Sequence, residues 1–178
     1  MTTDIILETD RLYFRGHILA DLDAYCVMEA DPDFRCYVGG RPRPREEAEQ
    51  RFMAGLKPVS DGLSMMAAVY KPENKYIGRC GIYPHFNSDG RPIHGEATLG
   101  LYIGKAYWGR GLATEAGRAF VNYGFIQLNL SKIVTMVRVE HDASVHVIKK
   151  LGFELVDTVK ENGPIFIILP STRPGFTE

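Results

Sequence analysis

GKAYWGRGLATEA, residues 104–116, is a glycine-punctuated turn that runs directly into a predicted helix. Gly109 and Gly111 free the backbone to turn sharply and let a ligand approach it closely. The first N–H groups of the following helix have no partner inside it, and the helix dipole is positive at that end. Such an arrangement favours a phosphate or a pyrophosphate. The stretch therefore predicts a phosphate-binding turn.

Two common nucleotide motifs fit this stretch poorly. Gly104 and Gly109 have the spacing of a P-loop, but the following lysine and hydroxyl residue are missing, which excludes that motif. Gly109 and Gly111 begin a dinucleotide fingerprint, but Thr114 replaces its third glycine. A nicotinamide-dependent oxidoreductase also needs an acidic ribose ligand about twenty residues further on. The chain offers none there, having instead Asn129, Ser131 and Lys132.

The segment from Tyr107 to Ala116 resembles the acetyl-coenzyme A loop of the GNAT acetyltransferases. The match is closest to the branch that contains the ribosomal-protein alanine N-acetyltransferases. The superfamily loop reads Gln/Arg-x-x-Gly-x-Gly/Ala, and Gly111 and Ala113 occupy its last two fixed positions. Trp108 stands at the first position, a departure that is typical of this branch.

Residues 139–153 resemble the second signature of the family, an Asn-x-x-Ser/Ala segment followed by a helix and Lys-Leu-Gly-Phe. The matching residues are Ser144, Lys150, Leu151, Gly152 and Phe153. Two departures matter. His141 replaces the family's asparagine, and Ile148 stands where many members carry a tyrosine that protonates the leaving thiol. Because Ile148 has no proton to give, a tyrosine-acid mechanism through that position is excluded.

Length and composition are ordinary for a globular protein. The chain has 178 residues, a net charge of -1 and 45% hydrophobic residues, and we expect a single domain over residues 1–178. Near-neutrality argues against a general nucleic-acid or membrane-surface binder. Three cysteines without metal-ligand spacing indicate reduced thiols and no metal site. With no signal peptide or membrane span in the sequence, we expect a cytoplasmic protein.

The order of predicted elements matches the GNAT fold along nearly the whole chain. That resemblance implies an α/β (α+β) domain with a mixed, twisted, mostly antiparallel sheet of about seven strands and about four flanking helices. Residues 85–95 are predicted to form a polar loop. We expect strands over 5–15, 64–70, 76–83, 96–103, 133–139, 153–159 and 165–169, and helices over 21–30, 45–56, 112–126 and 143–151.

The resemblance also implies where acetyl-CoA would bind. The end of the strand over 96–103, formed by Leu101, Tyr102 and Ile103, would pair with the pantetheine arm. The same three residues would present an N–H to the thioester carbonyl. Backbone amides of the turn would hold the pyrophosphate. These are the amides of Gly109, Arg110, Gly111, Leu112, Ala113 and Thr114. Three side chains complete the expected cofactor site: Trp108, His141 and Ser144.

Three residues are candidates for the chemistry. An aliphatic amine has a pKa of about 10 and must lose a proton before it attacks. Glu96 is one candidate base, and His141 is the rival because a histidine titrates near neutral pH. Ser144 resembles the proton donor of the ribosomal branch and would hydrogen-bond the departing thiolate. Structural roles compete for all three: an exposed strand end, a helix-entry histidine and a serine in the first turn of a helix.

These features predict an acetyl-CoA-dependent N-acetyltransferase that acts by direct transfer in a ternary complex. Its partners would be acetyl-CoA and a primary amine, on a protein N-terminus or a small molecule, in a monomer or homodimer. A catalytically silent acyl-CoA-binding or regulatory module of the same fold is the alternative. Eight acids in the first 33 residues mildly favour a cationic acceptor, although a solvated acidic surface explains the same count. The basic stretch over 41–45 is predicted to be a solvated loop.

Overall fold

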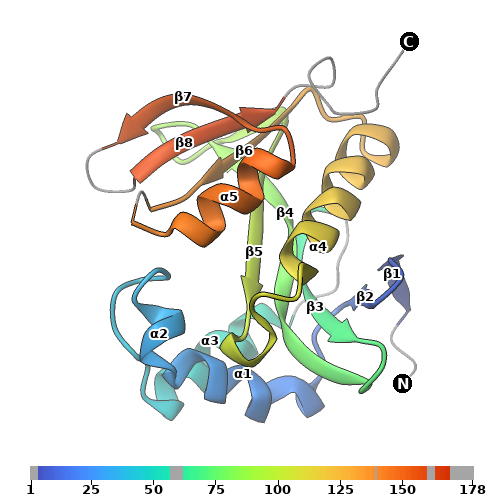
Figure 1. The fold of residues 1–178 in the computed structure, drawn as a ribbon, viewed down its shortest axis with the longest axis vertical. Helices are drawn as coiled ribbons and strands as arrows, with labels where there is room; N and C mark the ends of the chain where they lie inside the picture. The colour runs from blue at the N-terminus through green and yellow to red at the C-terminus, as the bar shows by residue number, and fades with distance from the viewer. Residues whose placement is uncertain (1–3, 57–61, 139, 160–162, 169–178) are drawn as a thin grey trace.

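A computed structural model of the chain describes residues 4–56, 62–138, 140–159 and 163–168. They form one eight-stranded sheet in the order β1-β2-β3-β4-β5-β6-β8-β7 (Figure 1). Along these residues every neighbouring pair is antiparallel except β5 and β6, which run parallel. The strands are β1 (Ile5–Glu8), β2 (Leu12–Arg15), β3 (Ser64–Tyr70), β4 (Lys75–Phe86), β5 (Pro92–Ile103), β6 (Lys132–Met136), β7 (Glu154–Val159) and β8 (Gly163–Ile168).

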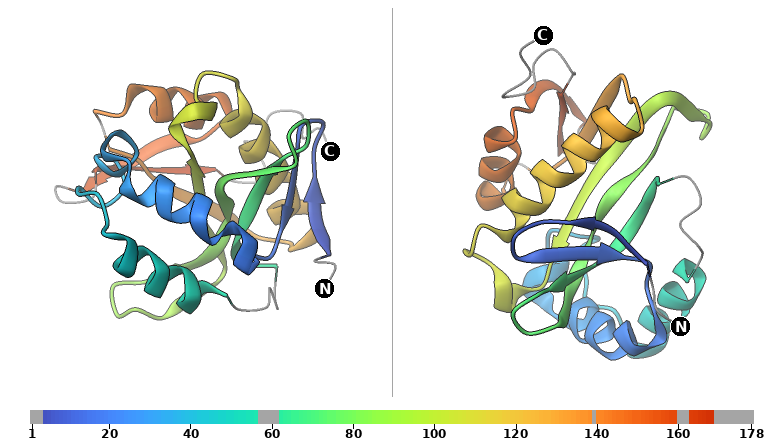
Figure 2. Two further views of the ribbon diagram at one scale, coloured as in Figure 1. Left: turned by 90° about the horizontal axis from the view of Figure 1, so that it is seen from below. Right: turned by 90° about the vertical axis from the view of Figure 1, so that its right-hand side faces the viewer.

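The helices cover the two faces of this sheet. Helices α4 and α5 lie on one face, and α1 and α3 lie on the other (Figure 2). Their bounds are α1 (Leu22–Ala30), α2 (Pro32–Arg35), α3 (Arg45–Gly55), α4 (Leu112–Asn122) and α5 (Asp142–Lys150). The larger apolar core lies between the sheet and α4, and includes Phe14, Met66, Ile82, Leu99 and Phe120. A smaller core lies under α1 and α3, around Tyr25, Cys26, Ala48 and Phe52. The mixed, mostly antiparallel architecture is thus confirmed.

The predicted first strand is in fact a hairpin. The chain turns between β1 and β2, where the Thr9 hydroxyl accepts a hydrogen bond from the Leu12 N–H at 3.0 Å. The Thr9 N–H in turn donates to the Leu12 carbonyl at 2.9 Å. A short polar side chain that bonds its own backbone favours a turn over a continuing strand. The sheet consequently has eight strands where about seven were expected.

The prediction of a loop over residues 85–95 was wrong. Strands β4 and β5 continue into this region as a hairpin, with Phe86 opposite Pro92. Only the tip is a turn, and there the Asn87 side chain accepts hydrogen bonds from the N–H groups of Asp89 and Arg91 at 3.0 and 2.9 Å. The polar side chains of this segment are compatible with a hairpin that projects toward solvent, because neither of its faces needs to be fully buried.

Helix α4 departs from the predicted apolar stripe at its end. Leu112, Ala116 and Phe120 are buried as expected, but Ile126 is 63% exposed. The cause is a π-helical turn over residues 123–127, in which the Leu128 N–H donates to the Tyr123 carbonyl five residues back. This wider turn rotates the following side chains away from the face that a 3.6-residue period predicts.

Helix α5 begins one residue earlier than predicted. His141 holds the N-cap position without a side-chain cap bond, and Asp142 is the first helical residue rather than the cap. A carboxylate in the first turn still interacts favourably with the helix dipole. At the other end Gly152 has φ +87°, the left-handed conformation predicted for it.

A methyl group at residue 81 tests how tightly β3 and β4 pack. A Cβ built on Gly81 lies 2.0 Å from the backbone oxygen of Ser64. We expect Gly81→Ala to lower the free energy of unfolding by about 3 kcal/mol, measured by urea unfolding, because the strands must separate locally. Gly55→Ala is the control, since a Cβ there meets nothing within 4 Å and the residue ends α3. Equal stability of the two variants would contradict the close approach.

Candidate active site

The parallel pair β5 and β6 parts before β5 ends. Their register covers three positions, from Glu96 opposite Lys132 to Thr98 opposite Val134. Strand β5 then continues to Ile103 without a described partner on that side. Beyond the last paired position, the Thr135 hydroxyl still donates to the Leu99 carbonyl at 3.1 Å. The divergence therefore exposes a backbone edge on β5.

Strand alternation decides which groups lie on this edge. The Leu99 carbonyl points toward β6, and the Gly104 N–H points the other way, to Ile77 of β4 at 2.8 Å. Because backbone groups of alternate residues face the same side of a strand, Leu101 and Ile103 face the opening. The Trp108 ring N–H already donates to the Ile103 carbonyl at 2.6 Å. The edge thus offers the Leu101 N–H and carbonyl and the Ile103 N–H, whereas the Tyr102 backbone faces β4.

The glycine turn follows at the same end of the sheet, where α4 begins beside the end of β5 (Figure 1). Gly109 and Gly111 have φ values of +73° and +75°, in the left-handed region that favours glycine. Six consecutive backbone N–H groups in this turn donate no hydrogen bond within the described residues. They belong to Gly109, Arg110, Gly111, Leu112, Ala113 and Thr114. The turn therefore presents a row of donors at the positive end of α4.

Glu115 anchors this turn to the β1–β2 hairpin. Its carboxylate accepts hydrogen bonds from the Thr9 hydroxyl at 2.6 Å and from the Arg11 backbone and side chain at 2.9 and 2.7 Å. Burial acts to raise the pKa of Glu115, but these hydrogen bonds outweigh it and the pKa is lowered. Arg11 also donates to the Arg110 carbonyl at 2.9 Å. The Arg110 side chain lies against the ring of Tyr107, 5.0 Å from its centre.

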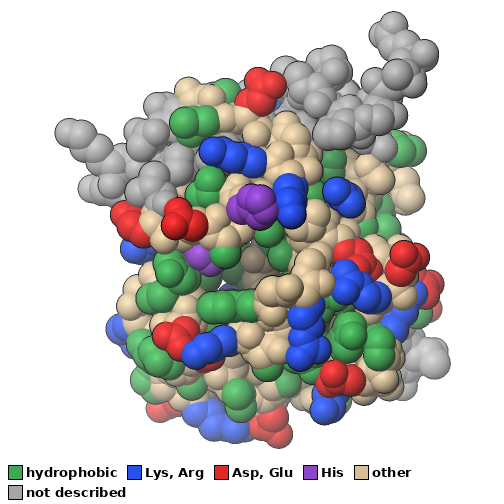
Figure 3. Space-filling model, viewed as in Figure 1, with side chains coloured by type: hydrophobic (Ala, Val, Ile, Leu, Met, Phe, Trp, Pro, Cys, Tyr) green, Lys and Arg blue, Asp and Glu red, His purple; other side chains and the backbone are tan. Residues whose placement is uncertain are grey.

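His141 and Ser144 lie together at the start of α5. The His141 ring stacks on Tyr37, with 3.8 Å between ring centres and an angle of 5°. Burial lowers the pKa of His141, so the ring is neutral at pH 7. The Ser144 N–H donates to the His141 carbonyl at 2.9 Å, and its side chain is partly exposed. The stack of His141 on Tyr37 links the start of α5 to the segment after α2. The surface of the molecule is hollowed below α5 on this face (Figure 3).

Glu96 does not join these residues. It lies on the paired part of β5, seven residues before Ile103, which corresponds to roughly 20 Å along a strand. Its carboxylate forms an ion pair with Lys132 at 2.7 Å. A base must reach the amine that it deprotonates, so this position and this partner argue against Glu96.

A second hollow, which we call the Tyr102 pocket, lies on the α1 and α3 side of β5 and measures about 450 Å³. Sequence reasoning missed most of it. Its lining includes His17, Tyr25, Arg35, Gly39, Arg43, Arg51, Met65, Arg79 and Tyr102. One available signal was Glu29, an acid on the same buried face of α1 as Tyr25 and Cys26. A buried acid requires cationic partners from elsewhere in the chain.

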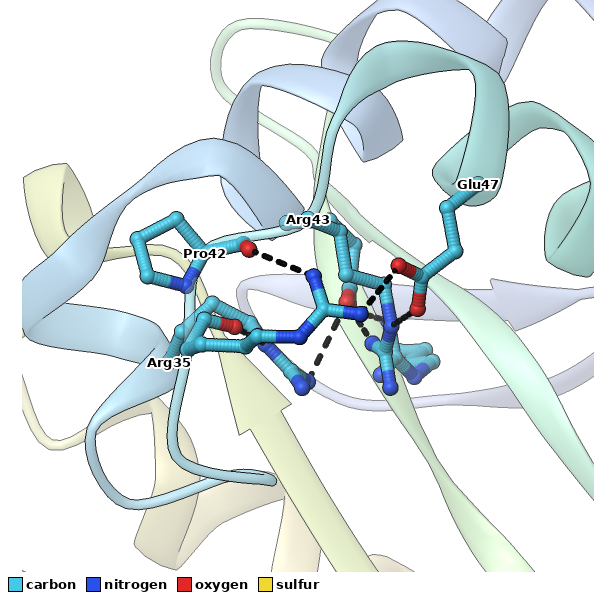
Figure 4. Close-up of polar contacts among 7 residues, drawn as sticks. Arg35, Pro42, Arg43 and Glu47 are labelled. Carbon is cyan, nitrogen blue, oxygen red and sulfur yellow. Dashed lines mark hydrogen bonds and ion pairs between the residues drawn. The ribbon is translucent and has the colours of Figure 1, made fainter.

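The basic stretch over residues 41–45 supplies one of these partners, so the prediction of a solvated loop was wrong for its middle. Arg43 is an ion-pair partner of the fully buried Glu29 and donates to Glu47 at 3.0 Å (Figure 4). Arg41 also pairs with Glu47, at 2.8 Å, and remains mostly exposed. The prolines hold the segment extended while its arginines turn inward and outward in alternation.

His17 is a neutral, half-buried histidine in the Tyr102 pocket. Its Nδ1 atom is buried and has no hydrogen-bond partner among the described residues. Burial is the main cause that lowers the pKa of His17 to about 4. The positive charges of Arg79 and Arg15 lower this pKa further, whereas the negative charge of Asp21 raises it.

The described residues contain no group of three or more His, Cys, Asp or Glu side chains that could hold a metal ion. Nor does any helix that the structure describes have the length and apolar character needed to cross a bilayer.

The chain belongs to the GNAT acetyltransferase family. Residues 11–154 match the family model described as an acetyltransferase (GNAT) domain, and the protein is accordingly an acyltransferase. The chain is 29% identical over 150 residues to an uncharacterised N-acetyltransferase, p20, of Bacillus licheniformis, covering 83% of this chain and 82% of that protein.

The resemblance to the ribosomal branch is also confirmed among the relatives. YdaF of Bacillus subtilis, named as a candidate ribosomal N-acetyltransferase, is 30% identical over 74 residues, 42% of this chain and 39% of that protein. In fold, the chain is similar to the spermidine N-acetyltransferase of Vibrio cholerae, solved in complex with CoA and spermine. The TM-score is 0.74 at 21% identity, with 92% of this chain and 98% of that chain covered.

The half-buried His17 predicts a component of stability that depends on pH. Its folded-state pKa of about 4 is below the unfolded value of about 6.5, so the unfolded chain takes up the proton first as the pH falls. Stability is therefore complete above about pH 6.5 and is lost toward pH 4, by up to about 3 kcal/mol. In urea unfolding between pH 7 and pH 4, we expect His17→Gln to lose less stability than the unmodified chain. His94→Gln removes an exposed histidine and should leave the slope unchanged; identical slopes for all three proteins would contradict the assignment.

Proposed function

We propose that the protein transfers the acetyl group of acetyl-CoA to a primary amine by direct attack in a ternary complex. One observation carries the proposal: the open edge of β5 leads directly to the row of free N–H groups at the start of α4. A long ligand with a diphosphate at one end and an amide-containing arm at the other matches both features. CoA has this construction.

The backbone would do most of the binding. The Leu101 N–H and carbonyl pair with the amides of the pantetheine arm as an added strand would. The N–H groups from Gly109 to Thr114 hold the pyrophosphate, aided by the dipole of α4. The Ile103 N–H lies further along the same edge and is the donor that we assign to the thioester carbonyl oxygen. Such a donor stabilises the negative charge that develops on this oxygen during attack.

Acetyl transfer then requires one bond to form and one to break. The neutral amine nitrogen attacks the thioester carbon, and the C–S bond breaks with its electron pair leaving on sulfur. The proton lost by the amine ends on the thiolate or in solvent. Ser144 is the residue that we assign to hydrogen-bond the thiolate, because it lies in the first turn of α5, where negative charge is favoured.

His141 is the better of the two predicted bases. It lies within three residues of Ser144, whereas Glu96 is held by Lys132 on the paired part of β5. The lowered pKa of His141 leaves the ring neutral at pH 7 and able to accept a proton. The stacked Tyr37 fixes the plane of the ring and directly precedes Val38 and Gly39, which line the Tyr102 pocket.

The comparisons support an amine as acceptor. The similar Vibrio cholerae enzyme is named for acetylation of spermidine, and its complex contains both CoA and a polyamine. In the present chain the acceptor would enter the Tyr102 pocket, since Tyr102 lies on the same strand as the proposed thioester donor.

Two glycines in equivalent conformations test the role of the turn. Gly109 and Gly90 both have φ +73°, and a Cβ on either meets nothing within 4 Å. Alanine therefore costs each site about 1–2 kcal/mol of backbone strain. We expect Gly109→Ala to weaken acetyl-CoA binding at least tenfold in isothermal titration, because the N–H row shifts. Gly90→Ala, at the hairpin tip, should bind normally; equal affinities would count against pyrophosphate binding here.

Replacement of Ser144 separates catalysis from binding. We expect Ser144→Ala to lower kcat about tenfold to a hundredfold in a thiol-release assay with an excess of amine, because the thiolate loses a hydrogen bond. The affinity for acetyl-CoA should change little. Ser88→Ala, an exposed serine of the β4–β5 hairpin, is the control. An unchanged kcat would remove Ser144 from the mechanism, and acetyl-CoA binding without thiol release from the unmodified protein over a broad amine panel would identify a silent module.

A further inference from the structure

We propose that the acceptor amine also carries a carboxylate, and that arginines of the Tyr102 pocket bind this carboxylate. The inference rests on the proposed acetyl transfer and specifies its substrate class. It starts from the composition of the pocket wall. Four arginines line it, and no acidic residue appears among its described lining residues; the arginines are Arg35, Arg43, Arg51 and Arg79.

A single fully buried carboxylate, Glu29, lies among three of these arginines. Its Oε1 atom is 2.8 Å from Arg79, and its Oε2 atom is 3.2 Å from Arg35 and also contacts Arg43. Glu47, at the edge, pairs with Arg43 as well. Four guanidinium groups therefore face two carboxylates, and the pocket keeps an excess of about two positive charges. Around a low-dielectric hollow, such an excess favours an anion.

The arginines also have hydrogen-bond donors to spare. A guanidinium group has five N–H donors, whereas the carboxylate of Glu29 has only two oxygens to share among three such groups. The Nη1 atom of Arg79 is buried and makes no hydrogen bond of good geometry within the described residues, although it lies in ion-pair distance of Glu29. The Oε1 atom of Glu29 is likewise buried without a hydrogen bond of good geometry, so these two atoms satisfy each other only as an ion pair. A carboxylate in the pocket would accept hydrogen bonds from guanidinium donors that Glu29 does not engage.

The cationic groups are held in place before any ligand arrives. Arg79 lies between the rings of Tyr25 and Tyr102, 5.0 Å from the centre of each. Arg35 donates to the Arg41 carbonyl at 2.9 Å, and its guanidinium lies directly beneath the backbone of Gly39. Groups that are already ordered lose little entropy on binding, which favours specific recognition of an anion.

Of the acids that favoured a cationic acceptor from sequence, Glu29 is compensated by the pocket arginines, and three others are used elsewhere. Asp21 forms an ion pair with Arg15 at 2.7 Å, Asp23 with Arg45 at 2.5 Å, and Glu8 with Lys71 at 2.6 Å. None of these acids lines the Tyr102 pocket. The charge of the pocket is therefore opposite to that expected from the composition of the N-terminal segment.

The positive pocket also helps the chemistry at the amine. Nearby cations disfavour the ammonium form of a bound acceptor and so promote the neutral, nucleophilic amine. The carboxylate holds the molecule in a site that would otherwise repel it. A volume of about 450 Å³ suits a small molecule such as an amino acid.

Matched amines that differ only in the acid group provide the test. Thiol release is measured with lysine and cadaverine, phenylalanine and phenethylamine, and O-phosphoethanolamine and ethanolamine. We expect kcat/KM to be at least tenfold higher for the amino acid of the first two pairs than for its decarboxylated partner. The third pair distinguishes a carboxylate from a phosphate: selectivity confined to this pair would overturn the assignment of a carboxylate.

Arg51 offers a variant that leaves the fold intact. It is exposed on α3 and forms no ion pair within the described residues. Arg51→Gln should lower the selectivity for the acid-bearing amines at least threefold without changing acetyl-CoA binding. Arg91→Gln, which removes an exposed charge from the distant hairpin, should not alter it. Arg79→Gln should abolish the selectivity, and its melting temperature shows whether it has folded.

Titration with acetyl-CoA separates this inference from the function on which it rests. No binding of acetyl-CoA would refute the proposed acetyl transfer itself. Binding of acetyl-CoA together with equal or better use of cadaverine than lysine would overturn only the carboxylate inference. If no amine of the panel is acetylated, the same pairs are titrated calorimetrically against the protein saturated with CoA. Preferential binding of the amino acids would then support the inference, and its absence would overturn it.

Discussion

The separation of β5 from β6 is the constraint on which the candidate site depends. Two parallel strands that pair over three positions and then diverge leave backbone donors and acceptors without a partner. Such groups are normally costly to bury, and a protein retains them where a ligand or solvent satisfies them. The connection between the two strands is α4, so the first turn of this helix lies at the open end. One topological feature thus provides both an edge for an extended arm and a helix terminus for a phosphate.

The other side of β5 is organised by the buried carboxylate of Glu29. It joins α1 to β4 through Arg79, to the segment after α2 through Arg43, and to α2 through Arg35. A buried carboxylate is unfavourable unless its charge is compensated, and here the compensation exceeds what one charge needs. The same contacts that hold these elements together therefore give the neighbouring pocket its charge. Structure and specificity share one set of side chains.

Much of the fold was predictable because its signals are local. Gly109, Gly111 and Gly152 are found in the left-handed conformations that the motifs imply, and both signature segments lie at helix termini. Other features could not be predicted from a regular local pattern. The exposure of Ile126 depends on a local change of helix period, the π turn, whereas the engagement of Glu96 depends on a tertiary contact, its register with Lys132. The Tyr102 pocket was missed for the same reason, since its arginines come from four separate segments. The catalytic and cofactor roles of the individual residues remain predictions.

The position of Gly39 has a consequence for how this pocket can diversify. A Cβ at residue 39 would lie 2.3 Å from the Arg35 guanidinium, and the backbone there has φ +92°. Any side chain at this position would both strain the loop and displace the arginine beneath it. Residues 35 and 39 are therefore expected to covary among related sequences. A lineage that acquires a bulkier residue at 39 would have to shorten or neutralise residue 35, and its preference among acceptors would change in the same step.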